Sequence, residues 1–247
     1  MNETVISTPV TTESNPLIDS LFKAGAHFGF GRSRRHPSIA SFIYGAKNGV
    51  DIIDLEKTEK LLLRAEAVME QLGREGKKVL FSGNKPEVRN AVRASALELG
   101  MPYVTERWVG GTFTNFTEIK KRIARMKELV ETKAKNGWAG YTKNEKALFQ
   151  KELDHLERFF KGIEDMSAFP AAVLVIDSRN EAIAVAEANR VKIPVVSLSG
   201  TDCDLEGIAY PVIANDAAAS SVKLFLNRMV AAYRRGQEAG RTTPQTA

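Results

Sequence analysis

The sequence has 247 residues, of which 43% are hydrophobic and 26% are charged, and its formal net charge is +5. A chain of this length and composition can bury a full core, as one large domain or one domain with an insertion, and its moderate positive charge is compatible with a nucleic-acid partner without establishing one. The single cysteine, Cys203, excludes an internal disulfide bond and a cysteine-rich zinc site, and no apolar run reaches the roughly 18 residues of a membrane span.

The two ends of the chain are poor in apolar residues. Residues 1–16 are rich in Thr, Ser, Asn and Pro and contain no signal-peptide core, so we expect a disordered arm. Residues 236–247 are expected to form a disordered tail for the same reason. The ordered part is therefore predicted to be an α/β domain, of residues 17–114 and 164–235, that residues 115–163 interrupt.

A basic segment follows a short helix that is expected to begin near Pro16. Between residues 20 and 50 there are five Lys or Arg residues and no Asp or Glu. Three of them are arginines within four residues, which repel one another and gain from an anionic partner. The segment predicts contact with RNA or another polyanion, and a solvated loop is the alternative. The residues concerned are Arg32, Arg34, Arg35, His36 and Lys47.

Short apolar segments alternate with amphipathic helical patterns through most of the chain. Parallel strands and right-handed crossovers follow from this alternation. We predict an α/β fold with a five-stranded, mostly parallel sheet and helices on both faces, like flavodoxin-like and Rossmann-like folds. The predicted strands, in chain order, are VDII at 50–53, KVLFSGN at 78–84, MPYVT at 101–105, AAVLVID at 171–177 and IPVVSLS at 193–199, with a short extended segment at 208–215 and a last helix from Asp216.

The interruption at residues 115–163 has the pattern of two helices joined by a turn. Its apolar residues recur at alternating steps of four and three, which is the heptad pattern of an antiparallel coiled-coil hairpin. Thr142 and Glu145 form a capping box before the second helix, and Ser178 and Glu181 form another before a later helix. The expected seam is Ile119, Ile123, Met126 and Val130 in the first helix and Phe149, Leu153, Leu156, Phe160 and Ile163 in the second.

Motifs of catalysis are missing from the sequence. It contains no GxGxxG after the first strand, no GxxxxGK[ST] and no GxSxG. Asp202 and Asp204 could hold a divalent cation, but such a pair in a glycine-containing turn is more often solvated. We therefore predict no catalytic residue, no metal and no cofactor. The alternative is a sugar-phosphate or nucleotide-sugar enzyme on the same fold, and a third hypothesis is an adaptor that binds proteins through the hairpin.

The stretch from Thr105 to Arg125 joins the domain to the hairpin. It supplies cationic side chains, hydroxyl groups and a helix start, which are the groups that engage phosphate. Trp108 in this stretch either stacks on an unpaired base or packs the hairpin against the sheet. The complete predicted RNA-binding set is Arg32, Arg34, Arg35, His36, Lys47, Lys85, Arg107, Trp108, Thr112, Thr114, Asn115, Lys120, Lys121 and Arg122.

Several segments, from AGAHFG through GMPYVTERWVGGTFTNF to YPVIANDAAASSVKLF, resemble segments of one known family and follow one another in the same order. Over residues 17–235 the chain resembles the bacterial small-subunit ribosomal protein two family. The resemblance implies a five-stranded parallel α/β domain with a coiled-coil hairpin and a non-catalytic role in the small ribosomal subunit of the cytoplasm. It also implies binding to small-subunit ribosomal RNA and neighbouring proteins, with protein one among them in many bacteria, and neither a membrane nor a small-molecule substrate as partner.

Overall fold

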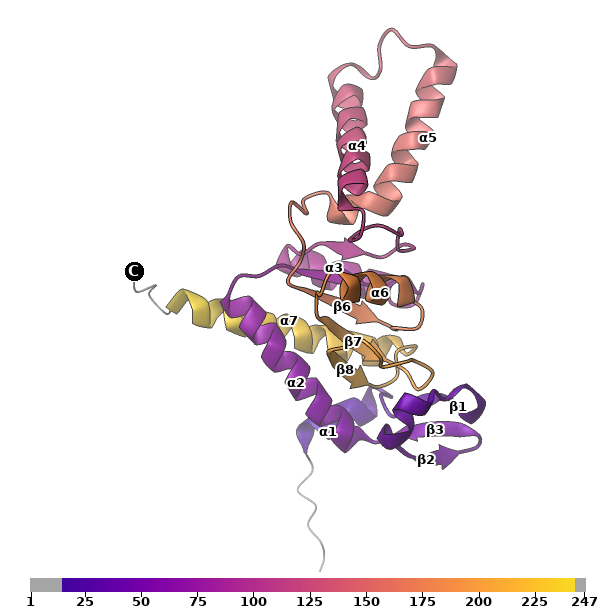
Figure 1. Cartoon of the computed structure of the whole chain (residues 1–247), viewed down its shortest axis with the longest axis vertical. Coiled ribbons are helices and arrows are strands. Elements are labelled where there is room, and N and C mark those ends of the chain that lie inside the picture. The colour runs from indigo at the N-terminus through magenta and orange to yellow at the C-terminus, as the bar shows by residue number, and fades with distance from the viewer. Residues whose placement is uncertain (1–14, 243–247) are drawn as a thin grey trace, which may run out of the picture.

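The parallel sheet of the protein has five strands in the order β5-β4-β6-β7-β8 (Figure 1). The computed structural model describes residues 15–242, so residues 1–14 of the arm expected at 1–16 and residues 243–247 of the expected tail lie outside the described residues. All neighbouring strands run parallel, which confirms the predicted sheet. The strands are β4 (Val79–Ser82), β5 (Tyr103–Val104), β6 (Ala172–Ile176), β7 (Val195–Ser199) and β8 (Tyr210–Ile213).

Helices cover both faces of this sheet because side chains alternate along each strand. Phe81 and Leu174 pack into one hydrophobic cluster with residues of α2, α3 and α7. Leu80 and Val173 point the other way, into a cluster with α6 and the root of the hairpin. The helices of the body are α1 (Pro16–Lys23), α2 (Leu55–Arg74), α3 (Arg89–Leu99), α6 (Ala182–Arg190) and α7 (Ala219–Thr242).

The strand at residues 50–53 does not belong to the parallel sheet, so this prediction was wrong. Strand β3 (Val50–Ile53) lies in a separate antiparallel sheet, of order β1-β3-β2, with β1 (Phe28–Gly31) and β2 (Ile43–Lys47). Its place as fifth parallel strand is taken by β8, and the hairpin follows the second parallel strand instead of the third. The reason is local: Asn48 and Gly49, with φ of 53° and 77°, form a two-residue turn that pairs β3 with the strand before it.

The small sheet and the basic segment are anchored at the carboxyl ends of the parallel strands. Thr201, just after β7, accepts a hydrogen bond at its carbonyl from the His36 N–H at 2.9 Å, and at its hydroxyl from the Phe30 N–H at 2.8 Å. A Cβ on Gly29 would lie 2.5 Å from the Thr201 side chain, so this contact needs a glycine. The basic segment contains two short 3-10 helices, η1 (Arg32–Arg34) and η2 (Pro37–Phe42).

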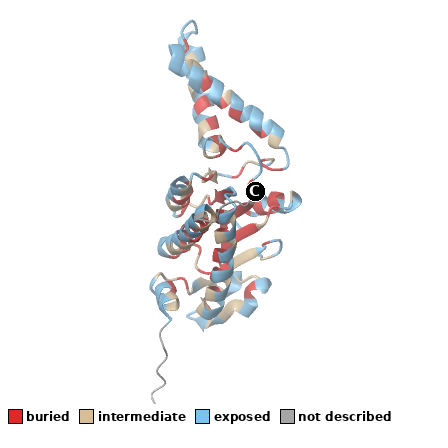
Figure 2. Ribbon diagram, turned by 90° about the vertical axis from the view of Figure 1, so that its left-hand side faces the viewer, coloured by how far each residue is buried: buried red, intermediate tan, exposed pale blue. Residues whose placement is uncertain are grey.

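Two helices, α4 (Phe116–Asn136) and α5 (Lys143–Phe160), protrude from the body as a hairpin, and η3 (Lys161–Ile163) leads back (Figure 1). The predicted capping box of Thr142 and Glu145 is present. Ile119, Ile123 and Met126 are buried as expected, but the next buried residue is Leu129, and Val130 is 41% exposed. The buried positions are thus spaced by four, three and three residues, which departs from the expected 4-3-4 heptad step, so coiled-coil pairing remains a prediction. Figure 2 shows the outer faces of the hairpin as exposed.

The last helix, α7, continues to Thr242, so residues 236–242 are helical and not the disordered tail that was expected. These residues are held because α7 crosses α2 at backbone distance. A Cβ on Gly236 would lie 1.9 Å from the Glu70 carbonyl oxygen, and a Cβ on Gly73 would lie 2.1 Å from the Tyr233 carbonyl oxygen.

None of the helices in residues 15–242 is long and apolar enough to cross a membrane.

Candidate nucleic-acid interface

Three adjoining pockets run from the basic segment, across the carboxyl ends of the strands, to the root of the hairpin. The first, of about 520 Å³, lies between the basic segment and residues 178–182. The second, of about 380 Å³, continues from residues 180–183. It shares Arg107 and Trp108 with the third, of about 530 Å³, which we call the corner pocket. We call the three together the arginine groove, after the arginines that line it: Arg34, Arg35, Arg89, Arg107, Arg122 and Arg179.

The basic segment lines this groove with Arg34 and Arg35, and Arg32 lies in η1 at its edge without lining any of the three pockets. Arg32 and Arg34 are exposed, and neither side chain has a hydrogen bond or ion pair within residues 15–242. Arg35 differs, because its guanidinium forms two hydrogen bonds to the buried carboxylate of Asp51. Of the other predicted residues, Lys47 is exposed next to the β2–β3 turn, and His36 places Nδ1 2.8 Å from Ser38 Oγ and 3.7 Å from the Asp204 carboxylate. Arg32 and Arg34 therefore offer the free charge, and Arg35 holds the segment in shape.

Lys85 lies inside the protein, where its charge is already matched. Its Nζ lies 2.6 Å from the Asp177 carboxylate and 3.3 Å from that of Asp216, and the side chain is only 21% exposed. Its charge is thus not free for RNA, contrary to the expectation. In doubly wound folds ligands bind at this edge of the sheet, and here the ion pairs occupy it.

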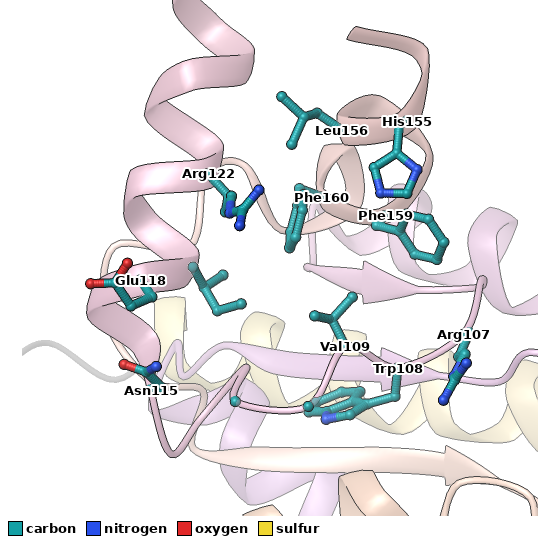
Figure 3. Close-up of a pocket in the computed structure, with 13 residues that line it drawn as sticks. Arg107, Trp108, Val109, Asn115, Glu118, Arg122, His155, Leu156, Phe159 and Phe160 are labelled. Atoms are coloured by element: carbon teal, nitrogen blue, oxygen red, sulfur yellow. The ribbon is translucent and has the colours of Figure 1, made fainter. Parts of the chain in front are cut away.

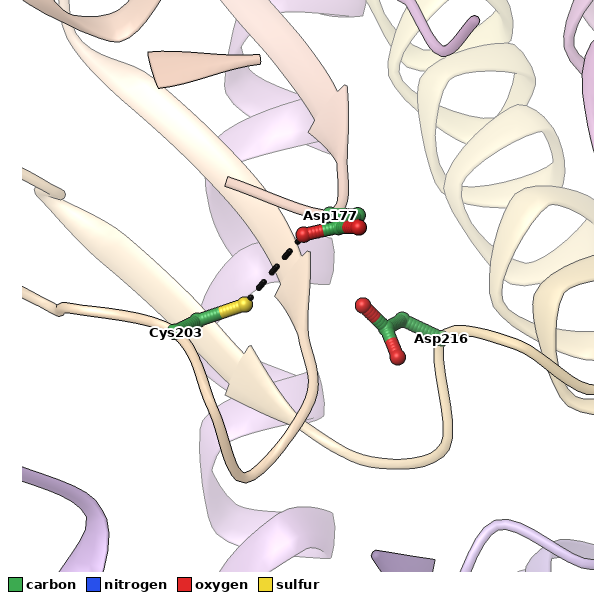
Figure 4. Close-up of side chains that lie close together, drawn as sticks. All are labelled: Asp177, Cys203 and Asp216. Carbon is green, nitrogen blue, oxygen red and sulfur yellow. Dashed lines mark hydrogen bonds between the residues drawn. The ribbon is translucent and has the colours of Figure 1, made fainter. Parts of the chain in front are cut away.

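Asp177, Asp216 and Cys203 form a buried cluster around this ion pair (Figure 4). The Cys203 thiol donates to the Asp177 carboxylate at 3.4 Å, and burial raises the pKa of this thiol to about 12. Burial also raises the pKa of Asp216 to about 6. Asp202 and Asp204, the two residues considered for a cation, bind different partners within the protein. Asp202 accepts a hydrogen bond from Arg179 at 2.7 Å, and Asp204 accepts one from the Glu206 N–H at 3.0 Å.

Glu181 does not close a capping box with Ser178, so that prediction was wrong. The backbone N–H groups of residues 179 and 180 instead donate hydrogen bonds to the Asp177 carboxylate, each at 3.1 Å. The Glu181 carboxylate instead reaches across to the end of β4, where it accepts from the Ser82 hydroxyl at 2.9 Å and from the Asn84 N–H at 3.0 Å. This carboxylate lies between β4 and β6, where the strand order reverses, so it bridges two strand ends at the position that ligands use in such folds.

Burial of Glu181 predicts a pH dependence of stability. Burial, and secondarily the charge of Asp177, raise the pKa of this carboxyl from 4.5 to about 7. The folded state therefore binds the proton more tightly, and its stabilisation is complete below pH 4.5 and lost as the pH rises to 7, by up to about 3 kcal/mol. In Glu181→Gln the amide oxygen can accept from Asn84 and the amide N–H can donate to Ser82, so we expect a smaller fall in stability between pH 5 and 8. Urea unfolding across this range measures it, and parallel curves for both proteins would contradict the assignment.

The Gly110–Gly111 turn ends in a row of backbone N–H groups that an anion already occupies. Glu187 of α6 accepts from the N–H of Gly111 at 2.5 Å, of Phe113 at 2.9 Å and of Thr114 at 3.4 Å. Such concave rows of N–H groups bind anions, and here the anion is a buried carboxylate of the protein itself. The turn therefore fixes the root of the hairpin to α6 and leaves phosphate contact to side chains.

Two predicted contact residues of this stretch lie in the interior. Trp108 is 3% exposed, and its ring meets that of Phe113 edge-on at 5.1 Å. Thr112 is 2% exposed, and its hydroxyl donates to the Val109 carbonyl at 2.6 Å. Both differ from the expectation of RNA contact, because the root of the hairpin needs a core of its own. The packing alternative for Trp108 is the one observed.

The remaining predicted residues of the corner lie on the surface. Arg107 and Arg122 line the corner pocket, and neither has a hydrogen bond or ion pair within residues 15–242. Lys120 donates to the Ser167 carbonyl at 2.9 Å, and Lys121 lies 2.6 Å from the Glu118 carboxylate. The exposed residues that start the hairpin are Thr114 and Asn115. The corner thus presents two free guanidinium groups.

The predicted RNA-binding set lacks other residues that line the groove, among them Arg89, Arg179, His155 and Phe159. Arg89 and Arg179 come shortly after the ends of β4 and β6, and both are paired, with Glu106 at 3.1 Å and Asp202 at 2.7 Å. Their position after buried strands was a usable signal. His155 and Phe159 of α5 line the corner pocket (Figure 3), and no local pattern could place them beside Arg107, which is about fifty residues away.

One comparison with known families bears on this architecture. The model of the family described as ribosomal protein S2 matches residues 21–236. The match begins within α1 and ends within α7, so it includes the basic segment, both sheets, the hairpin and every residue named in the arginine groove. It agrees with the family that the sequence resembles. The chain therefore belongs to the ribosomal protein S2 family.

Proposed function

We propose that this protein binds small-subunit ribosomal RNA through the arginine groove and so helps to hold the small ribosomal subunit together. One observation carries the proposal: arginines from five separate parts of the chain line three adjoining pockets. Arg34, Arg107 and Arg122 among them have no acidic partner within residues 15–242. Guanidinium groups suit this role because their planar fork matches phosphate oxygens.

The family implies a structural, non-enzymatic protein of the small subunit, and the groove fits such a role. Double-stranded RNA hides its base edges in a deep and narrow groove, so contacts to phosphate and shape dominate its recognition. The enzyme alternative has no support here: the polar groups of Lys85 and Glu181 at the strand ends are bound by internal contacts. Binding of neighbouring ribosomal proteins, with protein one among them, remains a proposal that rests on the family alone.

Charge reversal in the basic segment tests the proposal. We expect Arg32→Glu/Arg34→Glu to weaken binding to purified small-subunit ribosomal RNA. The slope of log K against log salt should become shallower by about 2, one unit for each phosphate that these arginines no longer neutralise. Arg35 is left unchanged because its removal would strand the buried Asp51 carboxylate and confuse folding with binding. Filter binding at several salt concentrations, together with incorporation into small subunits, provides the measurement.

A matched control separates the site from net charge. Lys60→Glu/Arg64→Glu changes the net charge equally on the exposed side of α2, where neither side chain has a hydrogen bond or ion pair to the rest of residues 15–242. This variant should retain the wild-type salt slope. Equal losses of affinity in the two double variants would point to general electrostatic attraction, and unchanged binding in both would remove the groove as the RNA site.

A further inference from the structure

The corner pocket has an aromatic wall as well as free positive charge. His155 and Phe159 are four residues apart on α5, so they lie on one face of the helix, with ring centroids 5.0 Å apart. Leu156 and Phe160 are buried in the root of the hairpin, whereas Phe159 is left half-buried and His155 exposed. Figure 3 shows these two rings next to each other, on the same side of the view as Arg107.

The remaining walls of the pocket carry charge and open backbone. Arg122 comes from α4 and Arg107 from the strand-end loop, and Figure 3 shows them on different sides of the pocket. The acidic residue in the lining, Glu118, is paired with Lys121, so the free charge in the pocket is positive. Gly110 adds no side chain, although the fold does not demand a glycine there: its φ is not positive, and a Cβ would meet only Glu187 Oε1, at 3.9 Å.

We propose that the corner pocket receives one unpaired nucleotide of the ribosomal RNA. The base lies against the rings of Phe159 and His155, and the flanking phosphates contact Arg107 and Arg122. A volume of about 530 Å³ is within the range of pockets that enclose small ligands. An aromatic surface with nearby arginines is the common arrangement for holding unpaired bases, because each base has a face that can stack and each linkage has a charge.

The proposal for this pocket rests on the proposed function, but the main interaction is stacking on aromatic rings and not attraction between charges. The basic segment contributes charge, which salt screens, whereas stacking on an aromatic ring is largely insensitive to salt. A protein segment with an acidic and an aromatic side chain would find similar chemistry in the pocket. The open walls and the position at the end of an arginine-lined groove favour the nucleotide.

Substitution of Phe159 tests the proposal. We expect Phe159→Leu to weaken binding to purified small-subunit ribosomal RNA about 10-fold at every salt concentration, with the salt slope unchanged. Phe159→Tyr keeps an aromatic ring and should retain most of the affinity. His155→Ala removes an exposed ring with little risk to folding and should show a smaller decrease in affinity. Chemical probing of the RNA bases should reveal a position that the wild-type protein protects and Phe159→Leu does not.

Each outcome decides between the two proposals. If Phe159→Leu and His155→Ala bind RNA like the wild type while Arg32→Glu/Arg34→Glu does not, the pocket proposal is overturned and the groove proposal stands. If the wild-type protein itself does not bind the RNA, the groove proposal fails first. Normal RNA affinity of Phe159→Leu with poor incorporation into small subunits would assign the pocket to a neighbouring protein and so overturn the nucleotide. Thermal unfolding of every variant checks that the fold is intact.

Discussion

Gly73→Ala is expected to destabilise the protein by about 2–3 kcal/mol, although alanine favours an isolated helix by about 1 kcal/mol. The added Cβ would lie 2.1 Å from the carbonyl oxygen of Tyr233, which is backbone and cannot rotate away. Relief requires α2 and α7 to separate. Tyr233 and Met69, which are almost fully buried beside this crossing, would then be partly exposed to water. Urea denaturation of the two proteins measures the difference.

The reciprocal change, Gly236→Ala, should destabilise the protein less. Its Cβ would lie 1.9 Å from the Glu70 carbonyl oxygen, but residues from 236 onward can detach at the end of α7 without opening the core. Gly45→Ala in β2 is the control, because no atom lies within 4 Å of its added Cβ. The sign of the effect is decisive: a stabilised Gly73→Ala variant would mean that the two helices do not touch at backbone distance.

Glu187→Ala is expected to cost about 2–4 kcal/mol, since removal of an acceptor costs roughly 1–3 kcal/mol for a buried donor that it leaves unpaired, a donor that water can reach costs less, and the costs do not simply add. The donors are the N–H groups of Gly111, Phe113 and Thr114. Glu187→Gln should cost less, because its amide oxygen can still accept from Phe113 and Thr114 while its amide N–H group faces the N–H of Gly111. Amide hydrogen exchange at residues 111–114, compared with global unfolding, measures the effect.

Loss of the Glu187 contacts to the Gly110–Gly111 turn should also weaken RNA binding. Without Glu187 the root of the hairpin is no longer attached to α6, so the walls of the corner pocket that come from α5 and from residues 107–111 no longer keep their spacing. We expect RNA affinity to fall along with the stability. Glu131→Gln, which alters an exposed pair with Lys135 at 3.8 Å, is the control. Unchanged exchange at residues 111–114 in Glu187→Ala would contradict the role of this carboxylate.

Local sequence patterns predicted the helices and strands better than they predicted which elements pair with each other. The five-stranded parallel sheet and the two protruding helices follow from runs of apolar residues and from periodicity, which neighbouring residues alone determine. The strand at 50–53 was misassigned because a strand followed by a helix suggested a parallel unit, while the Asn48–Gly49 turn that pairs it backwards went unused. The expected seam was wrong at Val130, because the helix buries Leu129 in its place and the heptad spacing does not continue.

The same distinction between local pattern and tertiary contacts applies to the residues of the candidate site. Charge and composition in the sequence pointed correctly to the basic segment and to the stretch around Arg107 as surface features. Lys85, Arg35 and Trp108 could not be judged in this way, because their availability depends on Asp177, Asp51 and the hairpin root, which only the folded chain brings near.

By itself, then, the sequence determined the class of fold, the presence of a helical hairpin and the family, because these depend on local pattern and on ordered motifs. Only the tertiary structure decided which charges are free. A buried carboxylate such as Glu187 or Asp177 must be matched within the interior, since an unpaired buried charge or polar group is costly. The cations and N–H groups that do this matching are not available to a partner, and of the arginines that line the groove Arg34, Arg107 and Arg122 keep a free charge.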